Sequence, residues 1–474
     1  MAAAIENNTL YRFRSIDRLL KGKKELENQS IFFAPPEILN DPVEGFRDIY
    51  FRGDKVMWES LLINYLLSLT VFTLDYLTFG EDEILDDNLR GLPSIDDVHE
   101  NLQVEFKIIS KSFIQSPEIQ DLINNIIKYR EKVSQQELSY YLSIIHLFSL
   151  SMIFNHLHKI NAIKENLFSQ LDIDISKRLN AQYFENTNRL IEEHGENTNE
   201  LIIEQHNHFL FQMSLLLDLN GSIRKPNKKT LFNTFPQKFI QKLEQVMYPN
   251  WFTACFMSRA TNSSIWGNYG DNHKGACLVF ETEVDESTKP YLTLDNTIVG
   301  AGSKGKIFGS SRMHFEEMQY CHKQDAINFF DSIGQVPMGK LYSSWFVSDD
   351  GKVSSNIPKF DETWRGEYWG EFDKSITKKT IDWKYENEFR LIIRNMFGSY
   401  PNTGATLNYS FKSLKGIIFG IKTSEEDKHE VIKIIEKKVR ENEQYDFKFY
   451  QAYYCRSSGI IKHTELSMLK FKSE

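Results

Sequence analysis

The fold is decided at residues 251–258, which read Trp-Phe-Thr-Ala-Cys-Phe-Met-Ser. This short, largely apolar run is typical of a buried strand. It follows a long segment, residues 55–249, in which Leu and Ile recur at positions i, i+3, i+4 and i+7, the spacing of helices with one apolar face. The change of period at residue 251 therefore predicts that a helical region ends and a sheet resumes.

Strand patterns occur at both ends of the chain. Residues 9–15 alternate apolar and polar side chains over most of their length, and further strands are expected at 276–283, 388–394, 416–419 and 446–454. Residues 1–54 alone are too few to bury a core. We expect an α+β fold with a mixed or antiparallel β core built from both chain ends and a large all-helical insertion. The expected domains are a discontinuous core, 1–54 and 250–474, and a helical insertion, 55–249.

Residues 286–364 contain four closely spaced glycines: Gly300, Gly302, Gly305 and Gly309. The run does not have the spacing of a phosphate-binding loop that opens a helix, so we expect a flexible surface connection.

Composition excludes several classes of protein. Of 474 residues, 41% are hydrophobic, which excludes global disorder, and the net charge of −9 argues against a protein that coats nucleic acid. The four cysteines contain no C-x-x-C pair, so we expect no structural metal site and a cytoplasmic location. Residues 61–79 approach the length of a membrane span, but polar residues interrupt them. We therefore expect a buried helix and no membrane association.

Three motifs carry side chains suited to chemistry. The first joins Tyr11-Arg12-Phe13-Arg14 to Asn40-Asp41-Pro42-Val43-Glu44. The second runs from Ser258 through Ser263, Ser264, Trp266, Tyr269 and His273 to Cys277. The third is Trp383-Lys384-Tyr385-Glu386-Asn387-Glu388-Phe389-Arg390.

Together these motifs resemble the bacterial domain-of-unknown-function family twenty-nine seventy-one. Members share a Tyr-(Lys/Arg)-aromatic opening, Asn-Asp-Pro-x-Glu, a Ser-(x)6-Met-Trp-x-x-Tyr-(Ala/Gly)-x-x-His-x-Gly-x-Cys core and a Trp-x-x-Glu-x-Glu-x-Arg strand. The resemblance covers residues 9–54 and about 250–455, and the sequence departs from it at Ile265, where Met is usual. It implies shared motifs and a shared fold, and no established reaction.

The third motif predicts a charged row on one strand. With a period of two, Glu386, Glu388 and Arg390 project from the same face. The two carboxylates raise each other's pKa, and the guanidinium lowers it. The row is either part of a site or the solvated face of an edge strand.

The other two motifs offer ligand-binding groups, and each has a structural alternative. Arg12 and Arg14 on one strand face suit phosphates, or pair with Glu386 and Glu388. Trp266 and Tyr269, one helical turn apart, suit a planar ligand, although Trp266 fits a core position equally well.

The order of these motifs is also similar to that of ADP-ribosyltransferases. That similarity implies an NAD-consuming enzyme in which Arg12 holds the dinucleotide and Ser258 or Ser263 steadies a ribose. Tyr269 would stack on nicotinamide, Glu388 would stabilise the transition state, and Glu386 would assist the acceptor. Catalytic residues are then Glu388, Glu386 and Arg12, and binding residues are Arg14, Ser258, Ser263, Trp266, Tyr269 and Arg390.

Two alternatives remain open. One is a Mg²⁺-dependent nuclease whose ligands are Asp41, Glu44, Glu386 and Glu388. The other is a ligand-sensing or adaptor module without catalysis. For all three readings we expect a role in bacterial toxin or phage-defence systems. If the protein is an NAD-consuming effector, nucleic acid is one candidate acceptor. We also expect a homo-oligomer or a protein partner bound through the helical insertion, because that insertion is rich in apolar surface.

Overall fold

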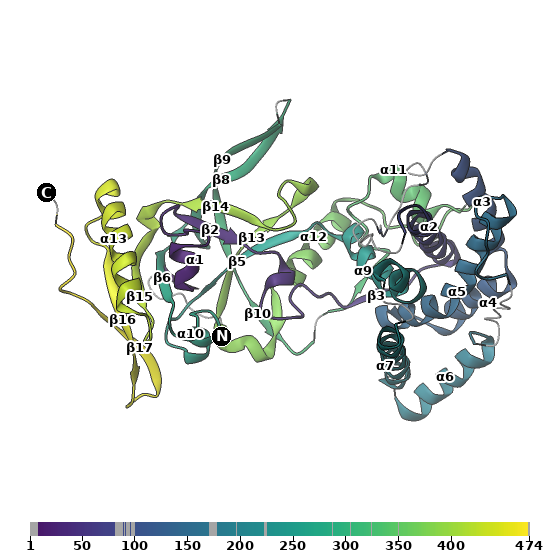
Figure 1. Cartoon of the computed structure of the whole chain (residues 1–474), viewed down its shortest axis with the longest axis horizontal. Coiled ribbons are helices and arrows are strands. Elements are labelled where there is room, and N and C mark those ends of the chain that lie inside the picture. Colours follow the sequence, from purple (N-terminus) through teal and green to yellow (C-terminus); the bar gives the residue numbers. More distant parts are fainter. Residues whose placement is uncertain are drawn as a thin grey trace. The chain divides into compact units, whose positions relative to one another are not determined.

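The computed structural model describes residues 8–80, 89, 91, 95, 100–169, 178–195, 197–221, 225–286, 288–303, 305–323, 325–348 and 350–472. The chain forms two compact units, whose elements are labelled in Figure 1. Unit 1 comprises residues 1–46, 249–324 and 373–474, and unit 2 comprises residues 47–248 and 325–372.

Two segments that the sequence places with the sheet belong to unit 2: residues 47–54 and 325–372. The reason is a small separate sheet. Its strand β3 (Ile49–Phe51) pairs with β11 (Ile327–Asn328) and with β4 (Val133–Ser134), which precedes a helix of unit 2.

Unit 1 contains a sheet of twelve described strands in the order β17-β16-β15-β6-β1-β5-β13-β9-β8-β14-β2, with β7 paired to β8. The strands are β1 (Thr9–Arg14), β2 (Ser30–Phe33), β5 (Trp251–Met257), β6 (Ala276–Glu281), β7 (Glu283–Val284), β8 (Pro290–Gly302), β9 (Gly305–Glu317), β13 (Glu388–Arg394), β14 (Ala405–Tyr409), β15 (Leu414–Phe419), β16 (Lys448–Cys455) and β17 (Ile460–Glu465). β1 pairs antiparallel with β6 and β5, whereas β15 and β16 are parallel. The expected α+β class, with a mixed sheet made from both chain ends, is confirmed.

The core of unit 1 follows from the alternation of its strands. Phe252, Ala254 and Phe256 of β5 are buried in one apolar cluster, which also receives one face of the helix α13 (Glu425–Asn442). Ser424 caps this helix by accepting a hydrogen bond from the Asp427 amide. The strongly amphipathic pattern of residues 424–441 predicted this helix to within one residue.

The sequence predicts a loop-rich surface connection at residues 286–364, and this prediction is wrong for the first part of that segment. β8 and β9 form a long antiparallel hairpin, visible as the projecting ribbon in Figure 1. The register shifts between Leu294 and Thr297 and again between Ile298 and Gly300. These irregularities and the glycines interrupt the period of two, so the strand pattern is hidden in the sequence.

Unit 2 is mainly helical. Its helices are α2 (Lys55–Phe79), α3 (Glu100–Ile114), α4 (Pro117–Tyr129), α5 (Gln135–Lys159), α6 (Ala181–His194), α7 (Asn197–Leu219), α8 (Pro226–Lys229), α9 (Phe235–Met247), α11 (Met338–Leu341) and most of α12 (Glu362–Thr377). In the described residues, α2 and α5 are long and apolar enough to cross a membrane, but 61% and 72% of their apolar windows are buried within the protein. Such burial is typical of core helices in a soluble protein, as expected for residues 61–79.

Candidate functional site

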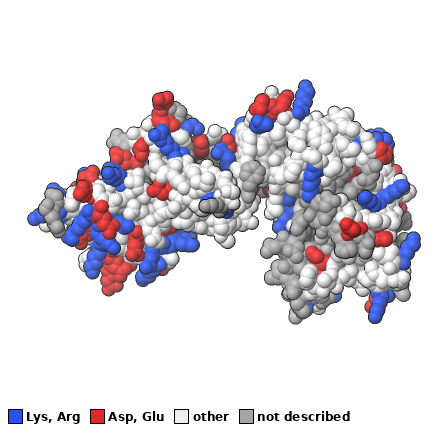
Figure 2. All heavy atoms as spheres, turned by 90° about the horizontal axis from the view of Figure 1, so that it is seen from above, with Lys and Arg blue, Asp and Glu red and all other residues white. Residues whose placement is uncertain are grey.

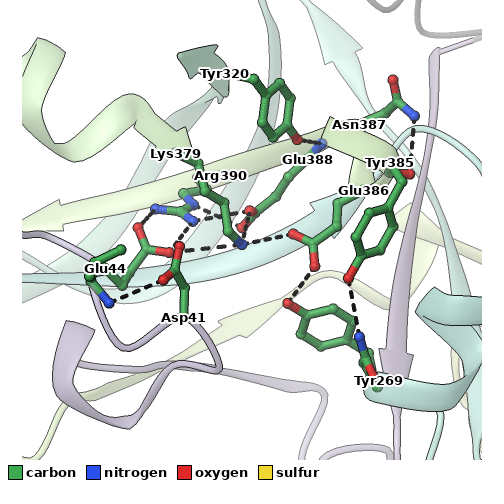
Figure 3. Close-up of polar contacts among 12 residues, drawn as sticks. Asp41, Glu44, Tyr269, Tyr320, Lys379, Tyr385, Glu386, Asn387, Glu388 and Arg390 are labelled. Carbon is green, nitrogen blue, oxygen red and sulfur yellow. Dashed lines mark hydrogen bonds and ion pairs between the residues drawn. The ribbon is translucent and has the colours of Figure 1, made fainter. Parts of the chain in front are cut away.

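Five charged side chains form a buried cluster in unit 1, shown in Figure 3. Lys379 Nζ lies 2.7 Å from Glu386 Oε2 and 3.1 Å from Glu388 Oε2. Arg390 donates from Nε to Glu388 Oε1 at 2.8 Å and from Nη1 to Glu44 Oε1 at 2.6 Å. Glu388 and Arg390 are at most 1% exposed. The cluster is therefore one connected network of ion pairs, shielded from water.

Strand pairing brings the members of this charged cluster together. β13 lies between β5 and β9, with Arg390 opposite Cys255. Lys379 lies on the short strand β12 (Lys378–Thr380), which pairs in parallel with β10 (Gln319–Cys321). Glu44 comes from a turn in which the Asp41 carboxylate accepts a hydrogen bond from the Val43 amide at 3.1 Å. The Asn-Asp-Pro motif thus serves as turn chemistry that presents Glu44 to Arg390.

Glu386 does not lie on β13, so the predicted row of three residues on one strand is wrong at this position. Residues 381–386 form the 3₁₀-helix η7 (Ile381–Glu386), and the strand begins only at Glu388. Between them Asn387 has a φ of 45°, a left-handed conformation that Asn tolerates better than most residues. The two carboxylates meet because both bond Lys379.

The pKa values of the two carboxylates move in opposite directions. Burial raises the pKa of Glu386, and Glu388 adds to this effect, while Lys379 only partly offsets it. Burial alone would raise the pKa of Glu388, but Arg390 and Lys379 outweigh it and lower that pKa to about 2. Three carboxylates against two cations leave the charged cluster with a formal charge of −1. Glu386 is thus the carboxylate on which a proton is most easily held.

Two tyrosines complete the polar contacts around these carboxylates (Figure 3). Tyr269 Oη donates to Glu386 Oε1 at 2.7 Å. The Glu388 amide donates to Tyr320 Oη at 2.9 Å. Burial and Glu386 raise the pKa of Tyr269, so it remains a protonated donor.

A pocket of about 130 Å³ opens beside the charged cluster. Its cationic wall consists of Arg12, Arg14, Arg18, Lys379 and Arg390. Apolar side chains, among them Phe32 and Met257, and the ring of Tyr269 form other parts of the wall. Polar groups that converge on a cavity beside apolar side chains are a feature that this pocket shares with ligand sites.

Arg12 is a buried cation of this wall for which the described residues supply no carboxylate partner. Its guanidinium is 1% exposed and donates to the carbonyl oxygens of Cys255 at 3.2 Å and Phe32 at 3.0 Å. It also lies 5.0 Å from the centre of the Phe256 ring. Among the described residues, no carboxylate pairs with Arg12 and its Nε has no hydrogen-bond partner. Arg12 therefore carries a buried positive charge that this part of the chain does not neutralise.

Five of the candidate site residues predicted from the sequence line the pocket: Arg12, Arg14, Tyr269 and Arg390, and Glu44 of the alternative Mg²⁺ site. Glu386 is connected to it through Tyr269, and Glu388 through Arg390. The alternative in which Arg12 and Arg14 pair with the two glutamates is wrong. Arg14 instead bonds Glu25 at 2.8 Å.

Three predicted binding residues lie outside the pocket lining. Trp266 is fully buried, packs edge-on against Phe13 and donates from Nε1 to the Ala260 carbonyl, so it is a core side chain and not a ligand platform. Ser263 is the exposed first residue of the short helix α10 (Ser263–Asn268). Ser258 is buried just beyond β5, and its amide bonds the Asn387 carbonyl. The backbone conformation around β5 and α10 sets the positions of these three side chains, and the sequence pattern does not predict that conformation.

Sequence reasoning missed Lys379, which joins Glu386 to Glu388, and Tyr320. Lys379 follows another lysine and has no motif around it, so nothing local marks it as buried. One consideration would have pointed to it: two buried carboxylates need a cation, and Arg390 alone cannot neutralise both.

The carboxylate oxygens of the charged cluster already accept hydrogen bonds from the cations of the cluster, which makes them less available to a metal ion. Among the described residues, no group of three or more His, Cys, Asp and Glu side chains is placed to hold a metal ion. Oxygens of Glu44, Glu386 and Glu388 accept from Lys379 or Arg390 instead.

Comparison with known proteins gives one match. Searches of curated proteins and of solved structures find no match to the chain. The matched segment, residues 265–391, contains Tyr269, Lys379, Glu386, Glu388 and Arg390. The segment as a whole matches the model of a family described as "Protein of unknown function (DUF2971)", which supports the family resemblance of the motifs.

Proposed function

We propose that the pocket of unit 1 binds a phosphorylated small molecule. The observation that carries this proposal is Arg12, a buried guanidinium on the pocket wall with no carboxylate partner among the described residues. An unpaired buried charge costs about 3–5 kcal/mol, so an anionic ligand group would relieve that penalty. Arg14 and Arg18 line the same pocket and would add donors for phosphate oxygens.

The charges of the site favour a ligand that carries both signs. One wall holds Arg12, whereas the charged cluster beside the pocket has a formal excess of one carboxylate. NAD⁺ combines a pyrophosphate with a cationic nicotinamide ring, and it is the ligand we propose. The reaction we propose is glycosyl transfer of the ADP-ribosyl type.

In this proposal Glu386 is the reacting carboxylate. Its Oε1 accepts a hydrogen bond from Tyr269, a residue of the pocket wall. Glu388 has both oxygens bonded to Arg390 and is better suited to holding the cations in place. The bond between the ribose carbon and the nicotinamide nitrogen would break, and nicotinamide would leave as a neutral molecule. Ionised Glu386 would stabilise the cationic sugar until an acceptor attacks the ribose carbon and passes its proton to Glu386, whose raised pKa suits it to accept one.

The experiment is incubation of the protein with NAD⁺ and chromatographic measurement of released nicotinamide. We expect release by the wild type and none by Glu386→Gln, while Glu425→Gln, at an exposed surface pair, behaves as the wild type. Binding of NAD⁺ without release of nicotinamide would favour the alternative of a ligand-sensing module without catalysis. Absence of both binding and release would refute the proposal.

A Mg²⁺-dependent nuclease is less well supported. Glu44, Glu386 and Glu388 already bond Lys379 or Arg390, so metal binding would have to break these pairs. On the described residues of the face in Figure 2, Lys and Arg are interspersed with Asp and Glu. Nucleic acid therefore enters the proposal only as one acceptor for the transferred group, and incubation with DNA or RNA plus Mg²⁺ tests for cleavage.

We also propose that unit 2 binds a protein partner or a second copy of the chain. In α7 the side chains of Phe209, Phe211, Leu216 and Leu219 are more than half exposed. A helix with so much exposed apolar surface usually has a partner. Light scattering at micromolar concentration tests for a dimer. A pocket unit joined to a helical unit also fits a cytoplasmic effector in bacterial toxin or phage-defence systems, and nicotinamide release in cells would test that role.

A further inference from the structure

A second cavity lies beside the pocket in unit 1, on the outer side of strands β2 and β14. Its volume is about 390 Å³, and its lining includes Glu25, Asn28, Phe32, Thr406 and Asn408. The two strands pair antiparallel, with Thr406 opposite Phe32 and Asn408 opposite Ser30. Because side chains alternate along a strand, these residues share one face, while Ile31 and Leu407 are buried on the other.

The two cavities share part of their walls. Phe32 lines both. Arg14 lines the first cavity and donates from Nε to Oε2 of Glu25, which lines the second, at 2.8 Å. One ring and one ion pair therefore belong to the boundary between them, so the two cavities are direct neighbours.

The lining of the second cavity differs chemically from that of the first. The Glu25 side chain is 2% exposed, and its Oε1 has no hydrogen-bond partner among the described residues. A carboxylate oxygen only accepts, so it requires a donor such as a hydroxyl group. Asn28, Ser30, Thr406 and Asn408 add neutral amides and hydroxyls, and the Phe32 ring offers an apolar face. Lys23, whose Nζ lies 5.2 Å from the centre of the Phe32 ring, adds one cation to the lining. This combination suits a sugar with neighbouring hydroxyls, because each hydroxyl both donates and accepts.

We infer that the second cavity binds the ribosyl part of the ligand whose phosphate lies in the first pocket. The inference rests on the proposed function and narrows it: the ligand is a nucleotide or dinucleotide, and not a short phosphorylated acid. The phosphate is held by Arg12 and Arg14, and the sugar hydroxyls donate to Glu25.

The test is Thr406→Trp, which fills the second cavity from an exposed position and leaves the core unchanged. Titration calorimetry with NAD⁺ and with inorganic pyrophosphate compares this variant with the wild type and with the matched control Thr406→Ser. We expect the affinity of Thr406→Trp for NAD⁺ to fall at least about tenfold, with pyrophosphate affinity unchanged, because only NAD⁺ has a sugar to lose.

The outcomes separate the two proposals. If the wild type binds both ligands and Thr406→Trp still binds NAD⁺ as tightly, the second cavity is not a sugar site, although the phosphate pocket stands. An equal loss of both ligands in Thr406→Trp also overturns the inference. If the wild type binds neither ligand, the proposed function fails and this inference fails with it.

Discussion

Arg390 and Glu44, which are 346 residues apart in the sequence, form a bidentate ion pair. Arg390 Nη1 lies 2.6 Å from Glu44 Oε1, and Arg390 Nη2 lies 2.9 Å from Glu44 Oε2. Both side chains are almost completely buried. The pair fastens the turn that follows the first two strands to the central strand β13. It also joins two of the three pieces of sequence from which unit 1 is built, residues 1–46 and 373–474.

Glu44→Gln should lower the free energy of unfolding by about 1–3 kcal/mol, because the amide keeps only one acceptor for Arg390 and removes the charge-assisted second hydrogen bond, while Glu388 still neutralises the guanidinium. Urea denaturation at neutral pH measures this loss. The matched control is Glu425→Gln, which breaks an exposed pair with Lys428 and should leave stability unchanged within error. Equal stability of the two variants would show that the Arg390–Glu44 pair contributes little.

Glu388→Gln should make the free energy of unfolding depend less on pH in the acidic range. The pKa of Glu388 is lowered from its ordinary 4.5 to about 2. Its stabilising contribution is therefore present above pH 4.5 and is lost as the pH falls towards 2. The difference in unfolding free energy between wild type and Glu388→Gln should narrow over that window.

Glu386→Gln is the control for this pH series. Because the pKa of Glu386 is raised, its contribution to stability has the opposite sign: it is present at low pH and is lost as the pH rises. The difference between wild type and Glu386→Gln should therefore not narrow on acidification. The same narrowing for both variants would contradict the assignment of the two carboxylates.

Tyr269→Phe should raise the pKa of Glu386 further, because it removes a hydrogen bond to the charged carboxylate. Carbon-13 NMR of labelled glutamate measures the titration, with Glu386→Gln to assign the resonance. The stability cost should be about 1 kcal/mol, since Lys379 still bonds the carboxylate. An unchanged titration midpoint would mean that Tyr269 does not tune Glu386.

Much of unit 1 could be predicted because local patterns determine it. The strand at residues 388–394 and the helix beginning after Ser424 follow from periodicity and capping. Arg12, Tyr269 and Arg390 could be proposed as one site because their motifs have specific spacings. In each case the information lies within a few neighbouring residues.

The remainder depends on contacts between distant segments. The pairing of β12 with β10 positions Lys379, and no sequence motif predicts that pairing. Arg12 donates to carbonyl oxygens and not to the carboxylates of one predicted alternative, because β1 lies beside β5 and the Arg12 side chain reaches the Phe32 carbonyl. Trp266 satisfies its indole nitrogen on the Ala260 carbonyl, so a side chain that looked available to a ligand is a core residue.

The most direct test of the central claim is the affinity for NAD⁺ of wild type and Arg12→Met, measured by titration calorimetry. Arg394→Met, at a partly exposed pair with Asp373, serves as the control, and Arg12→Lys, which keeps the charge, covers the case in which Arg12→Met fails to fold. We predict that wild type and Arg394→Met bind NAD⁺ alike, that Arg12→Met loses at least about tenfold in affinity, and that Arg12→Lys lies between them. Folded Arg12→Met that binds NAD⁺ as tightly as the wild type would contradict the account.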